Sequence, residues 1–271
     1  MQLQLASLNS GSNGNCYYIG NETEAVLIDA GLSCRETEKR IHQLGLDIKK
    51  IKAIFISHEH KDHISGVAVL SKKYQLPVYI TKKTLNNCWP GIENHLVHSF
   101  VAEEKISVGN LIITAFTKSH DANDPHSFII HCAANCIGVF TDIGHACKNV
   151  IQYFRLCHAV FLESNYDERM LDNGNYPIHL KRRITGGKGH LSNTQALELF
   201  CENKWMGLRL LILSHLSENN NSEKIVDELF TKHAGATEIF VASRYSASRI
   251  FLINEKIGRI ENVRMQQMRL F

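Results

Sequence analysis

Short apolar runs separated by polar stretches recur along the chain. The first, from Leu3 to Leu8, alternates apolar and polar residues, which predicts an edge strand or a half-buried strand. The run 51–56 is β-branched enough to indicate a buried strand. Further strands are predicted at residues 17–19, 25–28, 77–80, 112–116, 127–131, 136–140, 159–162, 210–213 and 238–242, and helices at 33–44, 66–74 and 192–200. Strands and helices joined by short connections are typical of the α/β class.

Five of these predicted strands run into a histidine, aspartate or glutamate. These residues are His58, His120, Asp142, Glu163 and His215. A single histidine after a strand is more often a hydrogen-bonded structural residue. Because the carboxyl ends of strands in an α/β sheet surround a shared site, the recurrence predicts that these side chains meet.

The densest chemistry lies in Ser57-His58-Glu59-His60-Lys61-Asp62-His63. His58 and His60 are two residues apart, so in an extended chain both imidazoles point to the same side. Asp62 and His63 follow where the chain should turn, and they can aim at a neighbouring point. The spacing therefore predicts two pairs of ligands for two adjacent metal ions. The alternative is a solvated polar loop after a strand.

Two divalent ions would clamp an oxygen of a scissile ester and activate a water or hydroxide. Such a pair needs a bridging carboxylate. Asp142 is the best candidate, although Glu163 and Asp167 lie at the next strand end. Imidazole-rich ligation suits Zn²⁺, and the carboxylates leave Mn²⁺ open.

Composition agrees with a folded protein that has a sizeable core. The chain has 271 residues, 44% hydrophobic and 21% charged, with a formal net charge of +3 and fifteen histidines. No Pro/Gly/Ser-rich linker divides it, so one domain over residues 1–271 is expected. The eight cysteines lack a C-x-x-C pair, and no apolar run reaches the roughly 20 residues of a membrane span. Without a leader at its amino terminus, the chain is expected to be a reduced, cytoplasmic protein with no membrane partner.

A second chemical signal is His190. It precedes a capping box formed by Ser192 and Gln195, so a helix amino terminus should point at whatever His190 touches. That arrangement suits a phosphate and the protonation of its leaving oxygen. The alternative is a structural histidine at a cap. The basic residues Lys181, Arg182, Arg183 and Lys188 sit in a Gly-rich segment between predicted elements, as a solvated charge run or an anion-binding group.

These motifs together resemble the metallo-β-lactamase superfamily. The match is to H-x-H-x-D-H at His58, His60, Asp62 and His63, followed in order by His120, Asp142 and His215. The resemblance implies an α/β fold of the four-layer αββα type. It also implies that His58, His60 and His120 bind one metal, that Asp62, His63 and His215 bind the other, and that Asp142 bridges them.

Within the superfamily the chain looks most like the YycJ (WalJ/VicX) group. The matching segments are 11–16, 57–66, 119–122, 163–165, 180–183, 189–193 and 213–217. Residues 189–192 and 213–215 also resemble ribonuclease Z, in which the first histidine is catalytic. The group usually carries Glu-Ser-Asn-His-Asp, whereas this chain has Tyr166 in place of that histidine.

The resemblance implies a dinuclear metal-dependent phosphodiesterase that acts on nucleic acid, with DNA favoured and a 5′ to 3′ exonuclease polarity. A metal-bound hydroxide would attack phosphorus, with Asp62 and His190 as catalytic residues. Lys181, Arg182, Arg183, Lys188 and Ser192 would bind the substrate. Two other interpretations stay open: a hydrolase of a small ester, such as a cyclic phosphodiester or a thioester, and a metal-bound regulatory protein without turnover.

Overall fold

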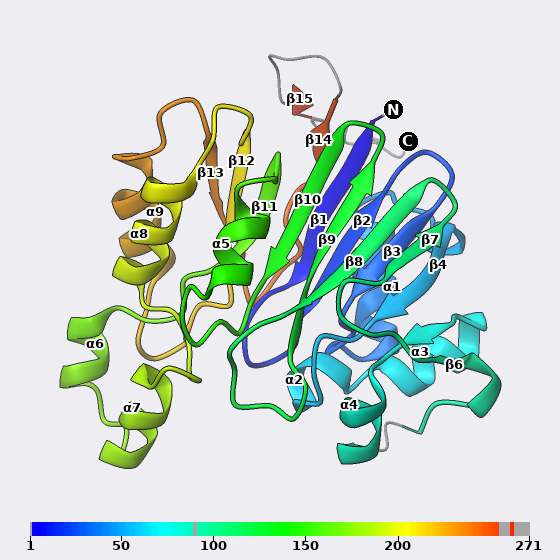
Figure 1. The fold of residues 1–271 in the computed structure, drawn as a ribbon, viewed down its shortest axis with the longest axis horizontal. Helices are drawn as coiled ribbons and strands as arrows, with labels where there is room; N and C mark the ends of the chain where they lie inside the picture. The colour runs from blue at the N-terminus through cyan, green and yellow to red at the C-terminus, as the bar shows by residue number, and fades with distance from the viewer. Residues whose placement is uncertain (1, 89–90, 255–260, 263–271) are drawn as a thin grey trace, which may run out of the picture.

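The structure is a computed structural model that describes residues 2–88, 91–254 and 261–262. The rest of the expected 1–271 domain lies outside the described residues. Two sheets dominate the fold, and most helices lie outside them (Figure 1).

The first sheet is built mainly from the amino-terminal part of the chain. Its strand order is β15-β14-β1-β2-β3-β4-β5-β6. The strands are β1 (Leu3–Asn9), β2 (Cys16–Gly20), β3 (Ala25–Ile28), β4 (Ile51–Phe55), β5 (Val78–Tyr79), β6 (Val97–His98), β14 (Phe251–Ile253) and β15 (Glu261–Asn262). The helical segments between them are α1 (Cys34–Gln43), η1 (Ile48–Lys50), α2 (Lys61–Ile64), α3 (Val67–Tyr74), α4 (Lys82–Asn87) and η2 (Asn94–Leu96).

The second sheet has the order β13-β12-β11-β10-β9-β8-β7. Its strands are β7 (Lys105–Val108), β8 (Leu111–Thr117), β9 (His126–Cys132), β10 (Asn135–Phe140), β11 (Ala159–Glu163), β12 (Leu210–Ser214) and β13 (Glu238–Val241). The helices of this part are α5 (Lys148–Phe154), α6 (Glu168–Asn173), α7 (Ile178–Thr185), α8 (Asn193–Asn203) and α9 (Glu223–Thr231).

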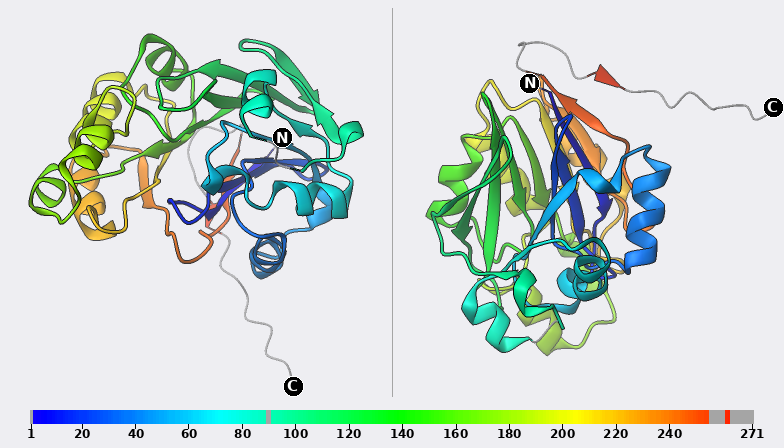
Figure 2. Two further views of the ribbon diagram at one scale, coloured as in Figure 1. Left: turned by 90° about the horizontal axis from the view of Figure 1, so that it is seen from below. Right: turned by 90° about the vertical axis from the view of Figure 1, so that its right-hand side faces the viewer.

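Three apolar clusters separate four layers of structure. The central cluster joins the facing sides of the two sheets, with Tyr17 and Phe55 from one sheet and Phe128 and Phe161 from the other. A second cluster packs α5, α8 and α9 on the outer side of the second sheet. The third packs α1 and α3 on the outer side of the first. This arrangement, seen along the sheets in Figure 2, confirms the predicted αββα sandwich.

Strand direction brings the predicted functional residues to one edge of the sandwich. β10, β11 and β12 are parallel neighbours, and β8 runs the same way because both β8 and β10 are antiparallel to β9. The segments that follow β4 and β11, which include α2, α6 and α7, lie along this edge (Figure 1). The side chains after five strands are therefore close in space although they span about 160 residues of sequence.

Two local predictions were wrong. Residues 3–8 form neither an edge strand nor a half-buried one, because β14 pairs with β1 on the side away from β2 and most of β1 is buried. The basic residues 181–183 do not lie between elements but within α7, a short helix that starts after Pro177 and ends before Gly186. In the part of the chain that the structure describes, no helix has both the length and the apolar character needed to cross a membrane.

Candidate metal centre

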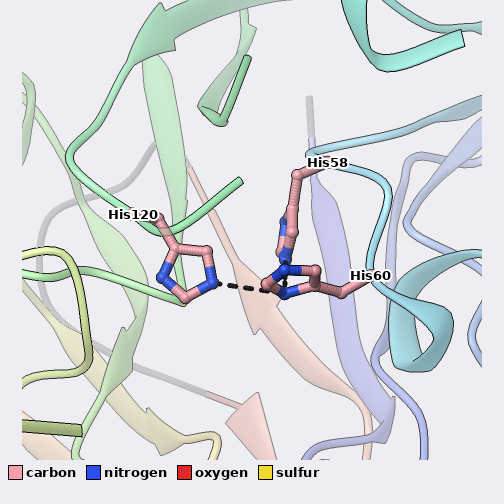
Figure 3. Close-up of side chains that lie close together, drawn as sticks. All are labelled: His58, His60 and His120. Carbon is pink, nitrogen blue, oxygen red and sulfur yellow. Dashed lines mark hydrogen bonds between the residues drawn. The ribbon is translucent and has the colours of Figure 1, made fainter. Parts of the chain in front are cut away.

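Three imidazoles converge beyond the ends of β4 and β8 (Figure 3). His58 Nε2 lies 3.1 Å from His60 Nδ1, which lies 3.4 Å from His120 Nε2. His120 Nδ1 is 3.0 Å from the carbonyl oxygen of Gly189. A carbonyl only accepts, so Nδ1 carries the proton and Nε2 presents a lone pair to the other rings. The spacing matches the edge of about 3.3 Å that follows from tetrahedral coordination with bonds of about 2.0–2.1 Å.

Burial keeps two of these rings neutral. It lowers the pKa of His58 well below its usual value and lowers the pKa of His120 to about 4. A metal ion binds the neutral imidazole, so these side chains are already in the ligand form near pH 7.

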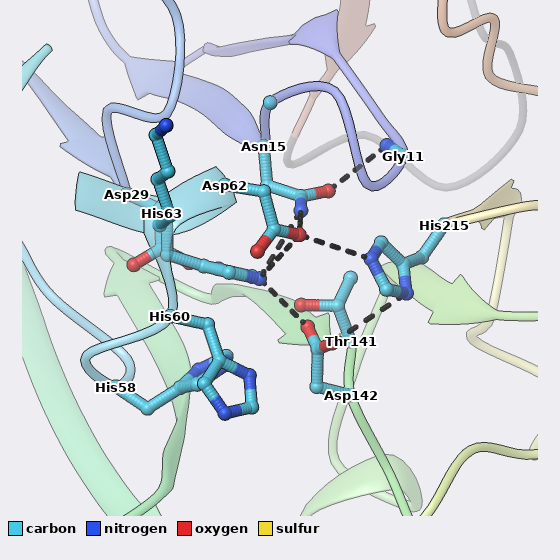
Figure 4. Close-up of polar contacts among 12 residues, drawn as sticks. Gly11, Asn15, Asp29, His58, His60, Asp62, His63, Thr141, Asp142 and His215 are labelled. Atoms are coloured by element: carbon cyan, nitrogen blue, oxygen red, sulfur yellow. Dashed lines mark hydrogen bonds and ion pairs between the residues drawn. The ribbon is translucent and has the colours of Figure 1, made fainter. Parts of the chain in front are cut away.

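A second donor group lies beside the first (Figure 4). Asp62 Oδ2 is 3.4 Å from His63 Nε2 and 3.6 Å from His215 Nε2. The Nδ1 atom of each ring points away, His63 to Asp29 Oδ2 at 2.7 Å and His215 to Glu163 Oε1 at 2.9 Å. Each Nδ1 therefore donates to a carboxylate, and each Nε2 faces the centre.

Asp142 lies between the two groups. Its Oδ2 is 3.2 Å from His63 Nε2, and its Oδ1 is 3.8 Å from His120 Nε2. The side chain is 2% exposed and follows β10 with a φ of 55°, which aspartate tolerates better than most residues. One carboxylate thus reaches both donor groups.

Buried polar atoms without a hydrogen-bond partner indicate whether these side chains are suited to bind cations. Among the described residues, Asp142 Oδ2 and His215 Nε2 are buried without a hydrogen-bond partner. Burying such atoms costs free energy unless they are satisfied. Burial would lower the pKa of His63 and His215, but Asp142 and the neighbouring carboxylates raise both, to about 10 for His215. Protons thus balance the carboxylates where cations are absent. This donor set fits divalent metal ions.

The turn that carries the ligands is fixed by its backbone. The carbonyl of His63 accepts from Ala30 N at 2.9 Å, and that of Asp62 accepts from Asn15 N at 2.7 Å. Gly31 permits this close approach, since a Cβ there would lie 1.7 Å from the Asp62 oxygen. Asn15 Nδ2 also donates to Asp62 Oδ2 at 3.0 Å. The loop 10–16 therefore supports Asp62, a proposed metal ligand, through Asn15.

Asp29 is a functional candidate that sequence reasoning missed. It is fully buried and accepts from Ser57 N and Ser57 Oγ, each at 2.8 Å, in addition to His63 Nδ1. It therefore sets the orientation and tautomer of His63. The available signal was an acidic residue directly after a strand, the same signal that identified Asp142.

Replacing Asp29 with asparagine is expected to weaken metal binding by about 10- to 100-fold. Asparagine tolerates the φ of 59°, so the backbone turn is kept while the charge that orients His63 is lost. Titration of metal-free protein with Zn²⁺ against a chromogenic chelator measures the change. Asp47→Asn is the matched control, because Asp47 only caps η1 by accepting from Lys49 N. Wild-type affinity in Asp29→Asn would contradict this role.

Lys118 is a second residue that the sequence did not reveal. Its buried Nζ donates to the carbonyl of Thr141 at 2.6 Å, which fixes the backbone just before Asp142. Burial lowers the pKa of the amine, while Asp142 and three other carboxylates oppose that effect. The ammonium thus offsets part of the negative charge around the site.

Glu163 lies behind the second donor group and accepts hydrogen bonds from it. It is 0% exposed and takes four donors: His190 Nδ1 at 2.8 Å and His215 Nδ1 at 2.9 Å on Oε1, and Ile143 N and Leu191 N at 2.7 and 3.1 Å on Oε2. Burial alone would raise its pKa, but the charge of His190 and the hydrogen bonds from both histidines lower it to about 2. Glu163 is therefore a carboxylate that orients two imidazoles.

The three carboxylates that compete for the bridging position differ in their free oxygens. Both oxygens of Glu163 are taken by N–H donors. Asp167 caps α6 by accepting from Met170 N at 2.9 Å. Asp142 keeps Oδ2 without a hydrogen bond from the described residues. The geometry thus favours Asp142.

His190 lies beside both donor groups without joining either completely. Its ring centre is 5.2 Å from that of His120 and 5.3 Å from that of His215. With Nδ1 bound to Glu163 and the side chain 22% exposed, Nε2 is the nitrogen left for a ligand in the adjoining pocket. That pocket has a volume of about 390 Å³ and is lined by Ser12, His60, Lys61, Asp62, Asp121, Asp142, Asn165, Tyr176, Leu180, Arg183, Ile184, Gly189, His190, His215 and Ser217.

The basic residues are placed unequally around the pocket. Arg183 lines it, pairs with Asp121 and is 62% exposed. Lys181 donates to the carbonyl of Asp172 at 2.7 Å, while Arg182 and Lys188 are exposed outside the lining. Arg183 is therefore the one of the four that reaches the pocket directly.

Ser192 and Tyr166 lie behind the pocket wall. Ser192 and Gln195 form the predicted capping box at the start of α8, in which the Ser192 hydroxyl oxygen accepts from Gln195 N at 3.1 Å. Tyr166 is 4% exposed, and its carbonyl accepts from Asn193 N at 2.8 Å. Neither residue is among the described residues that line the pocket. Ser192 thus positions the helix after His190.

Comparison with known proteins agrees with this geometry. The sequence profile of the metallo-beta-lactamase superfamily matches residues 10–154. The chain is 34% identical over 233 residues to exodeoxyribonuclease YycJ of Bacillus anthracis, covering 83% of this chain and 86% of the relative. It is 30% identical over 227 residues to exodeoxyribonuclease WalJ of Streptococcus pneumoniae, covering 80% and 83%. The fold matches the metallo-beta-lactamase fold protein YhfI of Bacillus subtilis with a TM-score of 0.73 at 15% identity, over 93% of this chain and 100% of the other. The chain therefore belongs to the metallo-β-lactamase superfamily and, within it, to the family of the YycJ and WalJ proteins.

Proposed function

We propose that this protein is a metal-dependent phosphodiesterase that degrades nucleic acid, with DNA as its substrate. The observation that carries the proposal is the pair of donor groups joined by Asp142 beside the His190–Glu163 hydrogen bond. The two donor groups form a site for metal-assisted hydrolysis, and His190, held by Glu163, is a positioned proton donor. The relatives named exodeoxyribonucleases support DNA as the substrate.

In this proposal the donor groups hold two ions. His58, His60 and His120 would hold one ion and Asp62, His63 and His215 would hold the other, with Asp142 between the two groups. When bound, the ions supply an acidified water nucleophile and stabilise charge on the phosphate oxygens. The three-imidazole group favours Zn²⁺, while the carboxylates of the second group leave Mn²⁺ as the alternative.

His190 is the proposed donor to the leaving group. Protonated on both nitrogens, it gives the Nε2 proton to the leaving oxygen as the phosphorus–oxygen bond breaks, and keeps Nδ1–H on Glu163. The Glu163 carboxylate stabilises the imidazolium before the transfer. Asp62 lines the same pocket and is the proposed acceptor of the proton lost by the attacking water.

The remaining proposed contacts bind the phosphate backbone. Arg183 lies at the pocket, and Lys181, Arg182 and Lys188 extend positive charge from it along α7 and the segment after it. Phosphate contacts of this kind make binding depend steeply on salt concentration. Ser192 acts only indirectly, through the helix cap.

The test is a nuclease assay. The protein is first made metal-free with a chelator and is then reloaded with Zn²⁺ or Mn²⁺. Substrates are single-stranded DNA, double-stranded DNA and RNA, each labelled at the 5′ or the 3′ end. We expect metal-dependent release of nucleotides from DNA, beginning at the 5′ end as the resemblance to the YycJ group implies. Metal analysis of the purified protein by plasma emission spectrometry identifies the ion.

Controls separate this function from the two alternatives. His60→Ala should lose activity, and a small chromogenic phosphodiester should be hydrolysed more slowly than DNA. Faster hydrolysis of the small ester would favour the small-ester hydrolase. The absence of a metal-dependent product from every DNA and RNA substrate would overturn the proposal.

We further propose a cytoplasmic location. Cys136 and Cys157 are thiols and not a disulfide, although their sulfurs are 3.9 Å apart. Free thiols are the usual state in a reducing compartment.

A further inference from the structure

One wall of the pocket is apolar, although the opposite wall consists of proposed metal ligands. Leu180 and Ile184 lie four residues apart on one side of α7, and Tyr176 lies in the segment just before the helix. All three are half-buried and line the pocket. No residue of α7 is fully buried, so this apolar side is not used to pack the helix into a core.

The ring of Tyr176 is held at the rim of the pocket. Its hydroxyl oxygen accepts from Asn219 Nδ2 at 3.1 Å, which connects the turn before α7 to the loop after β12. Further along the helix, Arg183 pairs with Asp121 from the loop after β8. Two polar contacts from different parts of the chain therefore fix this apolar wall over the proposed metal ligands.

The pocket thus combines three chemical surfaces. Asp62, Asp142 and His215 are the proposed metal ligands, and Arg183 brings a positive charge. The wall made by Tyr176, Leu180 and Ile184 presents an aromatic ring and two aliphatic side chains. A nucleotide has the complementary parts, because an anionic phosphate is joined to a flat aromatic base. The cavity of about 390 Å³ falls in the range of roughly 300–1,000 Å³ typical of small-ligand sites.

We propose that this wall binds the nucleobase next to the scissile phosphate, with Tyr176 stacking on the base and Leu180 and Ile184 contacting its face or its sugar. The inference rests on the proposed function and adds a substrate subsite to it. Stacking is tolerant of sequence because every base has a π-face. Leu180 and Ile184 offer no hydrogen-bond donor to a base edge, and Tyr176 would contact the base through its ring face. The subsite therefore selects for the presence of a base and not for its identity.

The experiment compares the two DNA substrates on which this subsite should differ. One substrate carries normal bases. The other carries one abasic residue next to the scissile phosphate, on its 5′ side in one version and on its 3′ side in a second version. Wild-type protein is expected to cleave the base-bearing DNA with a kcat/KM about 10- to 100-fold higher. In Tyr176→Ala this ratio should fall toward 1, whereas Tyr176→Phe, which keeps the ring, should retain most of it.

Ile178→Ala is the matched control, because Ile178 lies on the same helix, is 63% exposed and is not among the pocket-lining residues described. Its ratio should equal that of wild-type protein. Leu180→Ala, which shortens the wall without touching Tyr176, should lower the ratio less than Tyr176→Ala does. Thermal unfolding and metal content verify that each variant is folded and loaded.

The outcomes separate this inference from the proposed function. An active wild-type protein with a ratio near 1, or an unchanged ratio in Tyr176→Ala, would overturn the base subsite and leave the nuclease proposal intact. Wild-type protein that cleaves no DNA or RNA would overturn the nuclease proposal and this inference with it.

Discussion

Asp142→Asn is expected to lower metal-dependent hydrolysis by about a thousandfold and to reduce bound metal from two ions to at most one per chain. The loss follows from the place of Asp142 between the two donor groups, with Oδ2 3.2 Å from His63 Nε2 and Oδ1 3.8 Å from His120 Nε2. A bound metal ion contributes several kcal/mol of charge stabilisation, and about 4 kcal/mol corresponds to a thousandfold in rate. Asparagine keeps the shape and tolerates the φ of 55°, so the change tests charge and not backbone strain.

Initial rates on end-labelled DNA and plasma emission spectrometry measure the two effects of Asp142→Asn. Asp167→Asn is the matched control, because Asp167 follows the next strand and only caps α6, a role that asparagine also fills. It should keep both ions and most of the activity. Two bound ions together with wild-type rates in Asp142→Asn would assign the bridging position to another residue.

The residues at this centre differ in how visible they are in the sequence. His58, His60, Asp62 and His63 are identified by spacing alone, because their convergence is a property of one short turn. His120, Asp142 and His215 require one further step, which is that parallel strands end at the same edge of a sheet. The alternation of strands and helices predicted the α/β class, and the resemblance to the metallo-β-lactamase superfamily implied the αββα architecture that supplies this edge.

The supporting contacts were not predictable because they depend on register between distant segments. Asp29 reaches His63 only because β3 pairs in parallel with β4, and the four donors on Glu163 come from three separate segments. Pairing with a distant segment also explains why β1 was wrongly predicted to be an edge strand. Its strand pattern was visible, but β14, which covers its free edge, has only three residues and lies about 240 positions away.

The prediction and the structure differ most for the basic residues 181–183. In the sequence, residues 181–183 are a run of positive charge. In the structure they are part of a helix that lines the pocket with Leu180, Arg183 and Ile184. The helix has only eight residues, which is too short for a reliable periodic pattern. The charges of Lys181 and Arg182 are visible in the sequence, whereas the positions of Tyr176 and Leu180 in the pocket lining are not.

Glu163→Gln is expected to lower both activity, by more than about a hundredfold, and the free energy of unfolding, by about 3–5 kcal/mol. The stability loss arises because a buried acceptor of four N–H groups becomes an amide that offers one carbonyl oxygen and one NH₂. Donors left unpaired cost about 1–3 kcal/mol each, and loss of one member of a buried charge pair costs about 3–5. Urea unfolding at fixed metal concentration measures the stability, and initial rates on DNA measure the activity.

A double-mutant cycle with His190→Ala separates the two roles of Glu163. His190 is partly exposed, so His190→Ala should lower activity while changing stability by less than Glu163→Gln does. If Glu163 acts on the leaving group through His190, then Glu163→Gln should reduce the rate of His190→Ala protein much less than that of wild-type protein. Fully additive losses would mean instead that Glu163 supports catalysis only through His215 and the metal ligands. Because both imidazoles donate to the same oxygen of Glu163, we expect a substantial coupling between His190 and Glu163 together with a residual effect of Glu163→Gln, carried by His215, when His190 is absent.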